Sequence, residues 1–111
     1  MVNSRAKGAR GELEFAHFIS DLFGVTARRG QQFAGGPDSP DIITEIQGIH
    51  HEVKRVENLN LAKAYAQSQR DAGDGEIPVV DHRRNGQQWM LTIAWKDVPT
   101  LVSILHPYIN K

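Results

Sequence analysis

Two carboxylates and a lysine, spaced as on a short strand, could support metal-dependent hydrolysis. Asp41 follows a proline, and eleven residues later the chain reads Glu52-Val53-Lys54. Because successive side chains of a strand point to opposite faces, Glu52 and Lys54 would share one face, roughly 6.5 to 7 Å apart. Two carboxylates also suit a hard divalent cation. Glu and Lys at this spacing are common on solvated strands, so an ordinary polar face remains the alternative.

Residues 40–54 are expected to form the hairpin that brings these groups together. Apolar residues precede Gln47-Gly48, a turn-forming pair, and a second strand-like run follows it. Hairpin pairing would set the carboxylate of Asp41 beside that of Glu52.

Two adjacent histidines precede Glu52. His50 would lie on the Glu52 face, where it could touch a substrate, be satisfied by a neighbour or be exposed, whereas His51 would face the other way with Val53. The two rings therefore cannot ligate one ion, and the five histidines of the chain show no zinc-site spacing.

A third carboxylate lies on the first predicted helix, residues 11–23. Its apolar stripe consists of Phe15, Phe18, Ile19 and Leu22. At 100° per residue, Glu12 falls roughly 50° from the centre of this stripe, and Glu14 falls on the far side. Glu12 would therefore turn toward the protein, although a carboxylate near a helix N-terminus can also simply complement the helix dipole.

The other elements follow from hydrophobic periodicity and turn residues. We expect a strand at 25–28, a Gly- and Gln-rich loop at 29–38, a helix at 60–72 capped by Asn58 or Asn60, strands at 77–80 and 89–93 around Asn85-Gly86, and a last helix from about Asp97 with Pro99 in its first turn. The order helix, three strands, helix, two strands, helix indicates an α/β domain with a mixed sheet.

Two helix faces are predicted to be buried. On the helix at 60–72, the inward residues are Leu61, Ala62, Tyr65, Ser68 and Ala72. On the last helix they are Leu101, Val102, Leu105, Tyr108 and Ile109. The last helix either closes the core or, with Trp89 or Trp95, packs against a second subunit.

Length and composition limit the number of domains and the classes of protein to which this chain can belong. A chain of 111 residues with 40% hydrophobic content supports one domain. The absence of cysteine excludes disulfides and thiolate metal sites, which favours an intracellular compartment. We find no apolar run near the ~20 residues of a membrane span, nor a signal-peptide core. Thirteen basic residues balance thirteen acidic ones, so nucleic-acid binding cannot rest on net charge.

The stretch Lys7-Gly8-Ala9-Arg10-Gly11-Glu12, followed by Pro40-Asp41 and Glu52-Val53-Lys54, resembles the Holliday junction resolvase branch of the PD-(D/E)XK nuclease superfamily. The runs at residues 29–32, 35–36 and 82–85 are similar to small phage and prophage nucleases of this type. The resemblance extends from about residue 7 to residue 93. It implies that residues 1–111 form a single domain with a restriction-endonuclease-like αβββαβ core, a mixed central sheet flanked by helices.

By this resemblance, Asp41, Glu52, Glu12 and the backbone carbonyl of Val53 would hold one or two Mg²⁺ ions, with Mn²⁺ as a substitute. Lys54 would orient or deprotonate the attacking water, or neutralise developing negative charge.

Two assignments near this site stay open. A helix glutamine in the resembled family borders the active site, and Gln67 fits this position, with Gln69 as an alternative. Pro37-Asp38 duplicates Pro40-Asp41, but a strand directly follows Asp41, which favours Asp41 as the ligand. Asp38 would then bind a water near the phosphate in a supporting role or cap a turn.

Basic and amide side chains around these motifs are candidate DNA contacts. They are Lys7, Arg10, Arg28, Arg29, Gln31, Gln32, Arg55, Lys63, Arg83 and Arg84. The alternative for the loop residues among them is an ordinary solvated loop, and exposed arginines at a turn are usually solvated groups without a further role.

The resemblance implies an endodeoxyribonuclease that uses magnesium and acts as a homodimer on branched DNA. Its place would be the cytoplasm of a bacterium or a phage-infected cell, in recombination or repair. Alternatives are a nuclease for flaps, single strands or duplex, a non-catalytic DNA-binding module, and a structural protein that shares the fold.

Overall fold

The computed structural model describes residues 4–30 and 40–109, with side chains from Gly8 onward. In this part of the chain, three helices pack around two small sheets in one α/β domain. The predicted order of helices and strands is confirmed. No helix within it is long and apolar enough to cross a membrane.

Helix α1, Ser4–Phe23, begins seven residues before the predicted start at residue 11. Glu12 therefore lies in the helix interior, and the interpretation of this residue as a complement to the helix N-terminus was wrong. Phe15 and Ile19 are buried in the hydrophobic core and Phe18 packs half-buried against it, as their spacing predicts. Ala16, which the predicted stripe did not include, is also buried. Leu22 instead remains 59% exposed.

The two strands that were expected to form a hairpin at residues 40–54 lie in different sheets. Strand β1, Ala27–Arg29, pairs antiparallel with β2, Ile42–Thr44, in a sheet of their own. Strand β3, Ile49–Arg55, pairs parallel with β4, Ile77–Arg83, which in turn pairs antiparallel with β5, Met90–Thr92. The predicted β2–β3 hairpin is therefore wrong.

The connection between β2 and β3 explains this error. The hydroxyl of Thr44 accepts a hydrogen bond from the backbone N–H of Ile46, and the Glu45 carboxylate accepts one from the N–H of Thr26. These bonds turn the chain toward β1 before it reaches Gly48, which has a φ of 95°. The Gly48 carbonyl then accepts a hydrogen bond from Ile77 and starts the pairing with β4.

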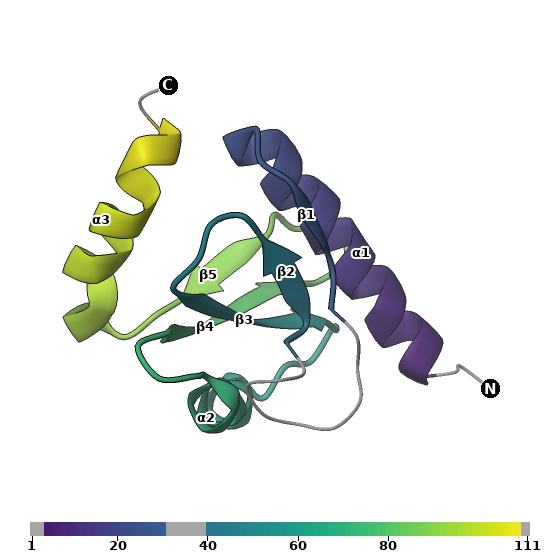
Figure 1. The fold of residues 1–111 in the computed structure, drawn as a ribbon. Coiled ribbons are helices and arrows are strands. Elements are labelled where there is room, and N and C mark those ends of the chain that lie inside the picture. Colours follow the sequence, from purple (N-terminus) through teal and green to yellow (C-terminus); the bar gives the residue numbers. More distant parts are fainter. Residues whose placement is uncertain (1–3, 31–39, 110–111) are drawn as a thin grey trace.

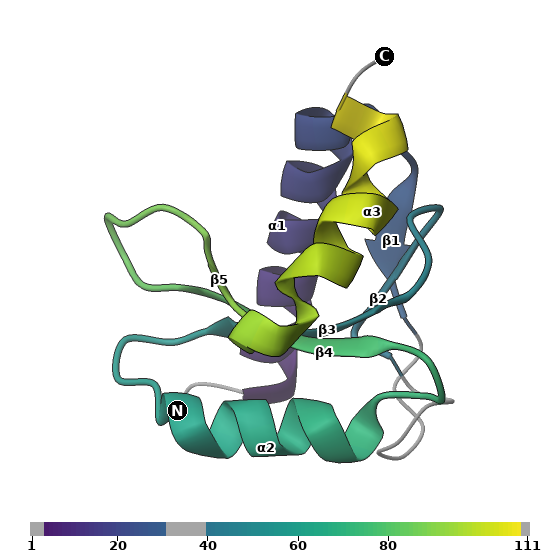
Figure 2. The same ribbon diagram turned by 90° about the vertical axis from the view of Figure 1, so that its left-hand side faces the viewer.

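Helix α2, Leu61–Asp71, covers the opposite face of the three-stranded sheet from α1 (Figure 2). The side chain of Asn60 caps it by accepting a hydrogen bond from the N–H of Lys63, which resolves the choice between Asn58 and Asn60. Its buried residues are Ala64 and Ser68. Leu61 and Ala62 are exposed, so the predicted inward stripe was wrong at its N-terminal end.

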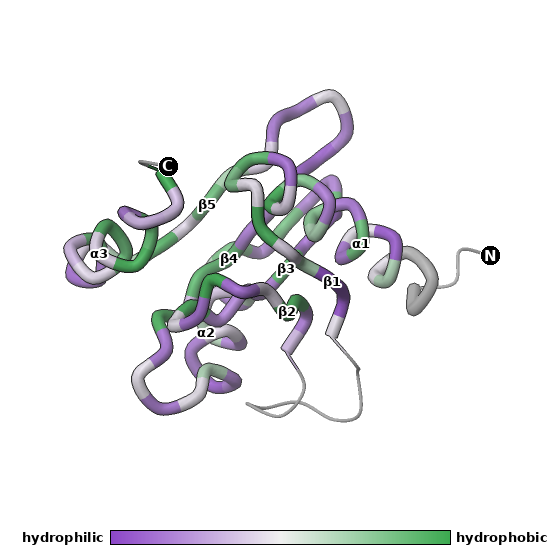
Figure 3. The backbone as a smooth tube through the Cα atoms, turned by 45° about the horizontal axis from the view of Figure 1, so that its top comes forward, coloured by the Kyte–Doolittle hydropathy of each residue, from purple (hydrophilic) through white to green (hydrophobic). Residues whose placement is uncertain are grey.

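The hairpin of β4 and β5 around Asn85-Gly86 is confirmed. A short 3-10 turn, η1, Trp95–Asp97, then leads into helix α3, Val98–Ile109. Helix α3 lies on the same side of the sheet as α1 but stands apart from it (Figure 1). Hydrophobic residues run along β4 and much of α3 (Figure 3).

Candidate active site

Glu52 and Lys54 lie on the face of β3 that α2 covers. The Lys54 Nζ atom is 3.8 Å from Glu52 Oε2 and donates a hydrogen bond of 3.3 Å to Gln67 Oε1 on α2. Glu52 is 4% exposed, whereas the Lys54 side chain is 29% exposed. The predicted sharing of one face is confirmed. Gln67 contacts Lys54, whereas Gln69 is exposed, so the geometry favours Gln67.

Asp41 reaches this region from the position just before the first residue of β2. Its carbonyl accepts a hydrogen bond from the N–H of Gly30, where a Cβ would lie 1.9 Å from the Pro40 carbonyl oxygen, so only glycine fits this close approach. Its carboxylate oxygen Oδ2 accepts a hydrogen bond of 2.9 Å from the N–H of Val53 on β3. A side chain thus makes the connection to β3 that the predicted hairpin would have made through the backbone.

Glu12 enters from α1. A Cβ on Gly11 would lie 2.7 Å from the Cβ of Arg55, so this glycine allows α1 to lie close against β3. Glu12 is only 8% exposed, which confirms that it turns toward the protein. Its Oε1 atom accepts from Arg29, with Nε at 3.0 Å and Nη2 at 2.9 Å.

The three carboxylates influence one another. The pKa of Asp41 is raised to about 7, first by burial, then by the negative charge of Glu52, with Glu12 adding to the shift. The hydrogen bond from Val53 and the charge of Lys54 act in the opposite direction. Asp41 therefore lies within electrostatic reach of both other carboxylates, in surroundings that favour its neutral form when no cation is added.

His50 is buried beside Glu52. Its Nε2 atom lies 3.5 Å from Glu52 Oε1 and makes no hydrogen bond within the described part of the chain. Burial lowers the pKa of His50, but the Glu52 carboxylate, with Glu76 and Asp41, raises it more, so the net shift is upward. Of the predicted roles, exposure is excluded by the 4% exposed fraction of His50.

Glu12, Asp41 and Glu52 all offer carboxylate oxygens, which are the type of ligand that a hard divalent cation prefers. Across residues 4–30 and 40–109, however, no three His, Asp or Glu side chains are arranged to hold an ion together. Each carboxylate has a partner instead: Arg29 for Glu12, the Val53 amide for Asp41, and His50 with Lys54 for Glu52. Metal binding would require these side chains to turn toward a common point.

The predicted DNA contacts divide into available and engaged groups. Arg10, Arg28, Lys63 and Arg84 are exposed. The other arginines are engaged: Arg29 with Glu12, Arg55 with Glu14, Glu57 and Asn85, and Arg83 with Glu14 and the Gln87 carbonyl. Gln31, Gln32 and Asp38 lie outside the described residues, as does the side chain of Lys7.

The Glu14 ion pairs were missed from the sequence. The helical projection placed Glu14 on the far side of α1, yet it joins α1 to Arg55 on β3 and to Arg83 on β4. Long side chains from neighbouring strands reach around the helix, which a projection of one helix cannot show.

A buried pair on the other face of β3 was also missed. His51 Nδ1 lies 2.5 Å from Asp81 Oδ2, and the His51 ring packs 5.4 Å from that of Phe15 between ring centroids. Asp81 directly follows the strand predicted at 77–80, and the sequence assigned it no role. The parallel register sets Glu52 against Val80 and Val53 against Asp81, so the pair depends on a strand pairing that the sequence does not reveal.

Comparison with protein-family models, with curated proteins and with solved structures finds no match to this chain. The functional interpretation therefore rests on the sequence motif and on the geometry described above.

Proposed function

We propose that the chain is a magnesium-dependent endodeoxyribonuclease of the PD-(D/E)XK type. One observation carries this proposal. The carboxylate of Asp41 accepts a hydrogen bond from the N–H of Val53, which lies between Glu52 and Lys54, and the Lys54 ammonium contacts the Glu52 carboxylate. The three carboxylates and Lys54 come from α1, from the position just before β2, and from β3, so sequence proximity alone does not bring them together.

The residues have distinct roles in this proposal. Asp41, Glu52, Glu12 and the Val53 carbonyl would hold one or two Mg²⁺ ions, or Mn²⁺ in their place. When bound, the metal activates water and stabilises charge on the scissile phosphate. Lys54 has an exposed fraction of 29% and is oriented by Gln67, so it can present its ammonium group to the water or to a phosphate oxygen.

Exposed cations near this cluster would bind the DNA backbone. Arg10 on α1, Arg28 on β1, and Lys63 on α2 are exposed, so they can contact phosphates. Arg29 would be recruited only after it leaves Glu12. The preferred substrate would be a four-way junction, cut by a homodimer, because two symmetric nicks require two active sites.

Cleavage of end-labelled DNA tests this function. A four-way junction, matched duplex and single strand would be compared in Mg²⁺, in Mn²⁺ and in EDTA, using the chain and the variants Glu52→Gln and Lys54→Ala. We expect paired, metal-dependent cuts at the junction and a loss of at least ~100-fold in each variant, as for removal of a group that acts in the transition state. Lys63→Ala, outside the cluster, should weaken binding but retain cleavage.

Other outcomes would change the proposal in defined ways. Equal cleavage of all substrates would retain a nuclease and reject junction selectivity. If DNA bound but no metal supported cleavage, the catalytic proposal would be rejected in favour of a DNA-binding module. Cleavage unaffected by both variants would show that another site performs the reaction.

A further inference from the structure

His50 has a ring nitrogen that is buried without a partner. This histidine lies near the start of β3, two residues before Glu52, and is only 4% exposed. Its Nε2 atom makes no hydrogen bond within the part of the chain that the structure describes. Buried polar atoms in native proteins almost always have a hydrogen-bond partner or a bound ion, so this nitrogen requires an explanation.

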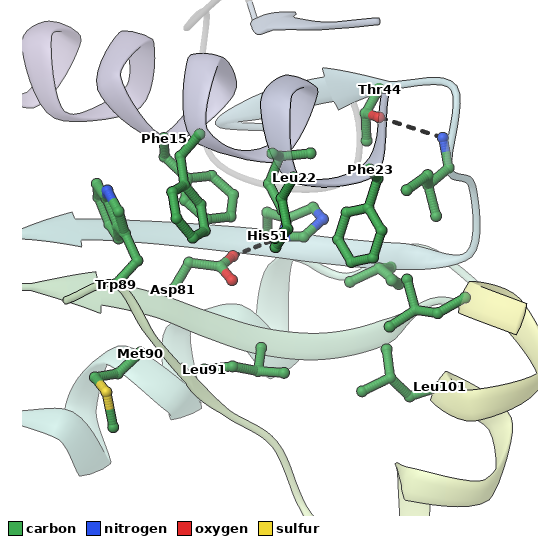
Figure 4. Close-up of a pocket in the computed structure, with 15 residues that line it drawn as sticks. Phe15, Leu22, Phe23, Thr44, His51, Asp81, Trp89, Met90, Leu91 and Leu101 are labelled. Atoms are coloured by element: carbon green, nitrogen blue, oxygen red, sulfur yellow. Dashed lines mark hydrogen bonds and ion pairs between the residues drawn. The ribbon is translucent and has the colours of Figure 1, made fainter. Parts of the chain in front are cut away.

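The neighbouring histidine of β3, His51, does have a partner. It lies on the opposite face of the strand, in an apolar groove of about 220 Å³ lined by α1 and α3. There its Nδ1 atom lies 2.5 Å from Asp81 Oδ2, and its ring packs against Phe15 (Figure 4). His51 is thus explained by the packing of the protein itself, whereas His50 is not.

The unpartnered nitrogen of His50 faces one oxygen of the Glu52 carboxylate. Nε2 lies 3.5 Å from Glu52 Oε1, whereas Lys54 Nζ lies 3.8 Å from the other oxygen, Oε2. An ordinary N–H···O hydrogen bond is shorter, about 2.7–3.2 Å. Two ligand atoms that are each about 2.1 Å from one metal ion lie roughly 3.0 to 3.5 Å apart. The spacing of Nε2 and Oε1 therefore suits two ligands of a single ion.

The charges around His50 also favour a cation. Burial lowers the pKa of His50, but three carboxylates raise it more: those of Glu52, Glu76 and Asp41. All three thus lie within electrostatic reach of the ring. A complete site needs at least one further ligand, because no three His, Asp or Glu side chains of the described residues surround a common point. Asp41 becomes that ligand when its carboxylate turns from the Val53 amide.

An imidazole ligand changes which ion a carboxylate site prefers. Mg²⁺ binds carboxylates and keeps several of its water ligands. Imidazole nitrogen suits first-row transition metal ions better than it suits Mg²⁺. A site that included His50 would therefore bind such an ion more tightly than the carboxylates alone would, whereas its affinity for Mg²⁺ would depend little on His50.

We propose that His50 Nε2, together with Glu52 Oε1, is a ligand of the divalent cation at the candidate active site. His50 makes this site prefer a first-row transition metal ion to Mg²⁺. The inference rests on the proposed function, because it adds a ligand to the same metal site. Sequence spacing does not reveal this role, since a single histidine on a strand lacks the pattern of a metal site.

Isothermal titration calorimetry of the full chain without DNA tests the preference, with Co²⁺ and Mg²⁺ as the probes. His50→Gln and His50→Ala should each lower the affinity for Co²⁺ at least ~10-fold, the smallest loss expected when even a group that orients a ligand is removed. The affinity for Mg²⁺ should change less than about threefold, because Mg²⁺ relies on oxygen ligands. Glu52→Gln should weaken the binding of both ions.

Pulsed electron paramagnetic resonance of the chain loaded with Mn²⁺ tests the bond itself. A nitrogen atom bound directly to Mn²⁺ gives a ¹⁴N modulation, which a residue with a purely structural role does not. This signal should be present in the unaltered chain and absent from both His50 variants. His17→Ala is the matched control, because His17 is exposed on α1 and should contribute nothing. Circular dichroism would establish that each variant is folded.

The outcomes separate this inference from the nuclease proposal. Equal losses of Co²⁺ and Mg²⁺ affinity in folded His50→Gln, or a nitrogen signal that persists without His50, would overturn the role of His50 and leave the carboxylate site standing. Binding that Glu52→Gln does not weaken would reject both this inference and the proposed metal site. A chain that binds Co²⁺ through His50 but cleaves no DNA would support the ligand and reject the nuclease.

Discussion

Arg29 holds Glu12 through a single carboxylate oxygen, with Nε at 3.0 Å and Nη2 at 2.9 Å from Oε1. The pair joins β1 to α1 beside Asp41. Within the proposed function, this guanidinium neutralises a carboxylate that a divalent cation would otherwise use. Arg29 and a metal ion thus compete for Glu12.

Arg29→Ala should therefore strengthen Mg²⁺ binding. Because the Arg29 side chain is 38% exposed, solvent screens its ion pair with Glu12. Loss of this pair should therefore raise the affinity for Mg²⁺ by about two- to fivefold. Isothermal titration calorimetry without DNA would measure the change. Arg28→Ala, on the exposed side of the same strand, is the control. If the two variants bind Mg²⁺ equally well, Arg29 does not compete for this site.

Gln67→Ala should lower the cleavage rate by about ten- to hundredfold, because a hydrogen bond to a charged group contributes about 1.5–3 kcal/mol. Gln67 accepts a hydrogen bond from the Lys54 ammonium, whereas Gln69 is exposed on the same helix. Single-turnover cleavage at saturating DNA would separate the effect from binding. Gln69→Ala should retain the full rate, and an equal loss in both variants would contradict the role given to Gln67.

The pKa of Asp41 predicts a pH-dependent stability in the absence of metal. Because its pKa rises from 3.8 in the unfolded chain to about 7, the folded chain binds more protons between these values. The free energy of unfolding should therefore decrease as pH rises through this range, and the contribution of Asp41 is fully present only below its unfolded pKa. The upward shift of the His50 pKa acts in the same direction above pH 6.5.

The Asp41→Asn variant removes the contribution of Asp41 to this pH dependence. Urea unfolding at pH 4, 5, 6, 7 and 8 in EDTA should show a flatter dependence on pH for the variant than for the unaltered chain. Asp74→Asn, on an exposed turn residue, provides a control that should keep the original slope. Identical slopes for Asp41→Asn and the unaltered chain would mean that Asp41 titrates normally in the fold.

Gly11→Ala should destabilise the domain and impair the candidate site together. The added Cβ would lie 2.7 Å from Arg55 Cβ, and such overpacking costs about 1–3 kcal/mol, which exceeds the ~1 kcal/mol that alanine gains inside a helix. Gly8→Ala is the matched control, because no atom outside its own helix turn lies within 4 Å of the new Cβ. Thermal unfolding should show Gly8→Ala more stable than the original chain and Gly11→Ala less stable. A stabilised Gly11→Ala would show that α1 does not depend on this close approach.

The sequence by itself determined the features that depend on neighbouring residues. The two-residue period of β3 placed Glu52 with Lys54 and separated His50 from His51. Helical periodicity turned Glu12 inward, and short-range side-chain bonding identified Asn60 as one of two possible caps. These inferences succeeded because strand alternation, helix pitch and capping are set within a few residues.

Only the tertiary structure decided which segments meet. It paired β2 with β1 instead of β3, brought Arg29 to Glu12, set Gln67 against Lys54, and placed His51 against Asp81. It also left Val102 and Ile109 of α3 exposed, although the predicted inward stripe of this helix included both. Backbone pairing and ion pairs between distant residues depend on how the whole chain packs, because a strand edge or a charge accepts any complementary partner that the fold brings near it.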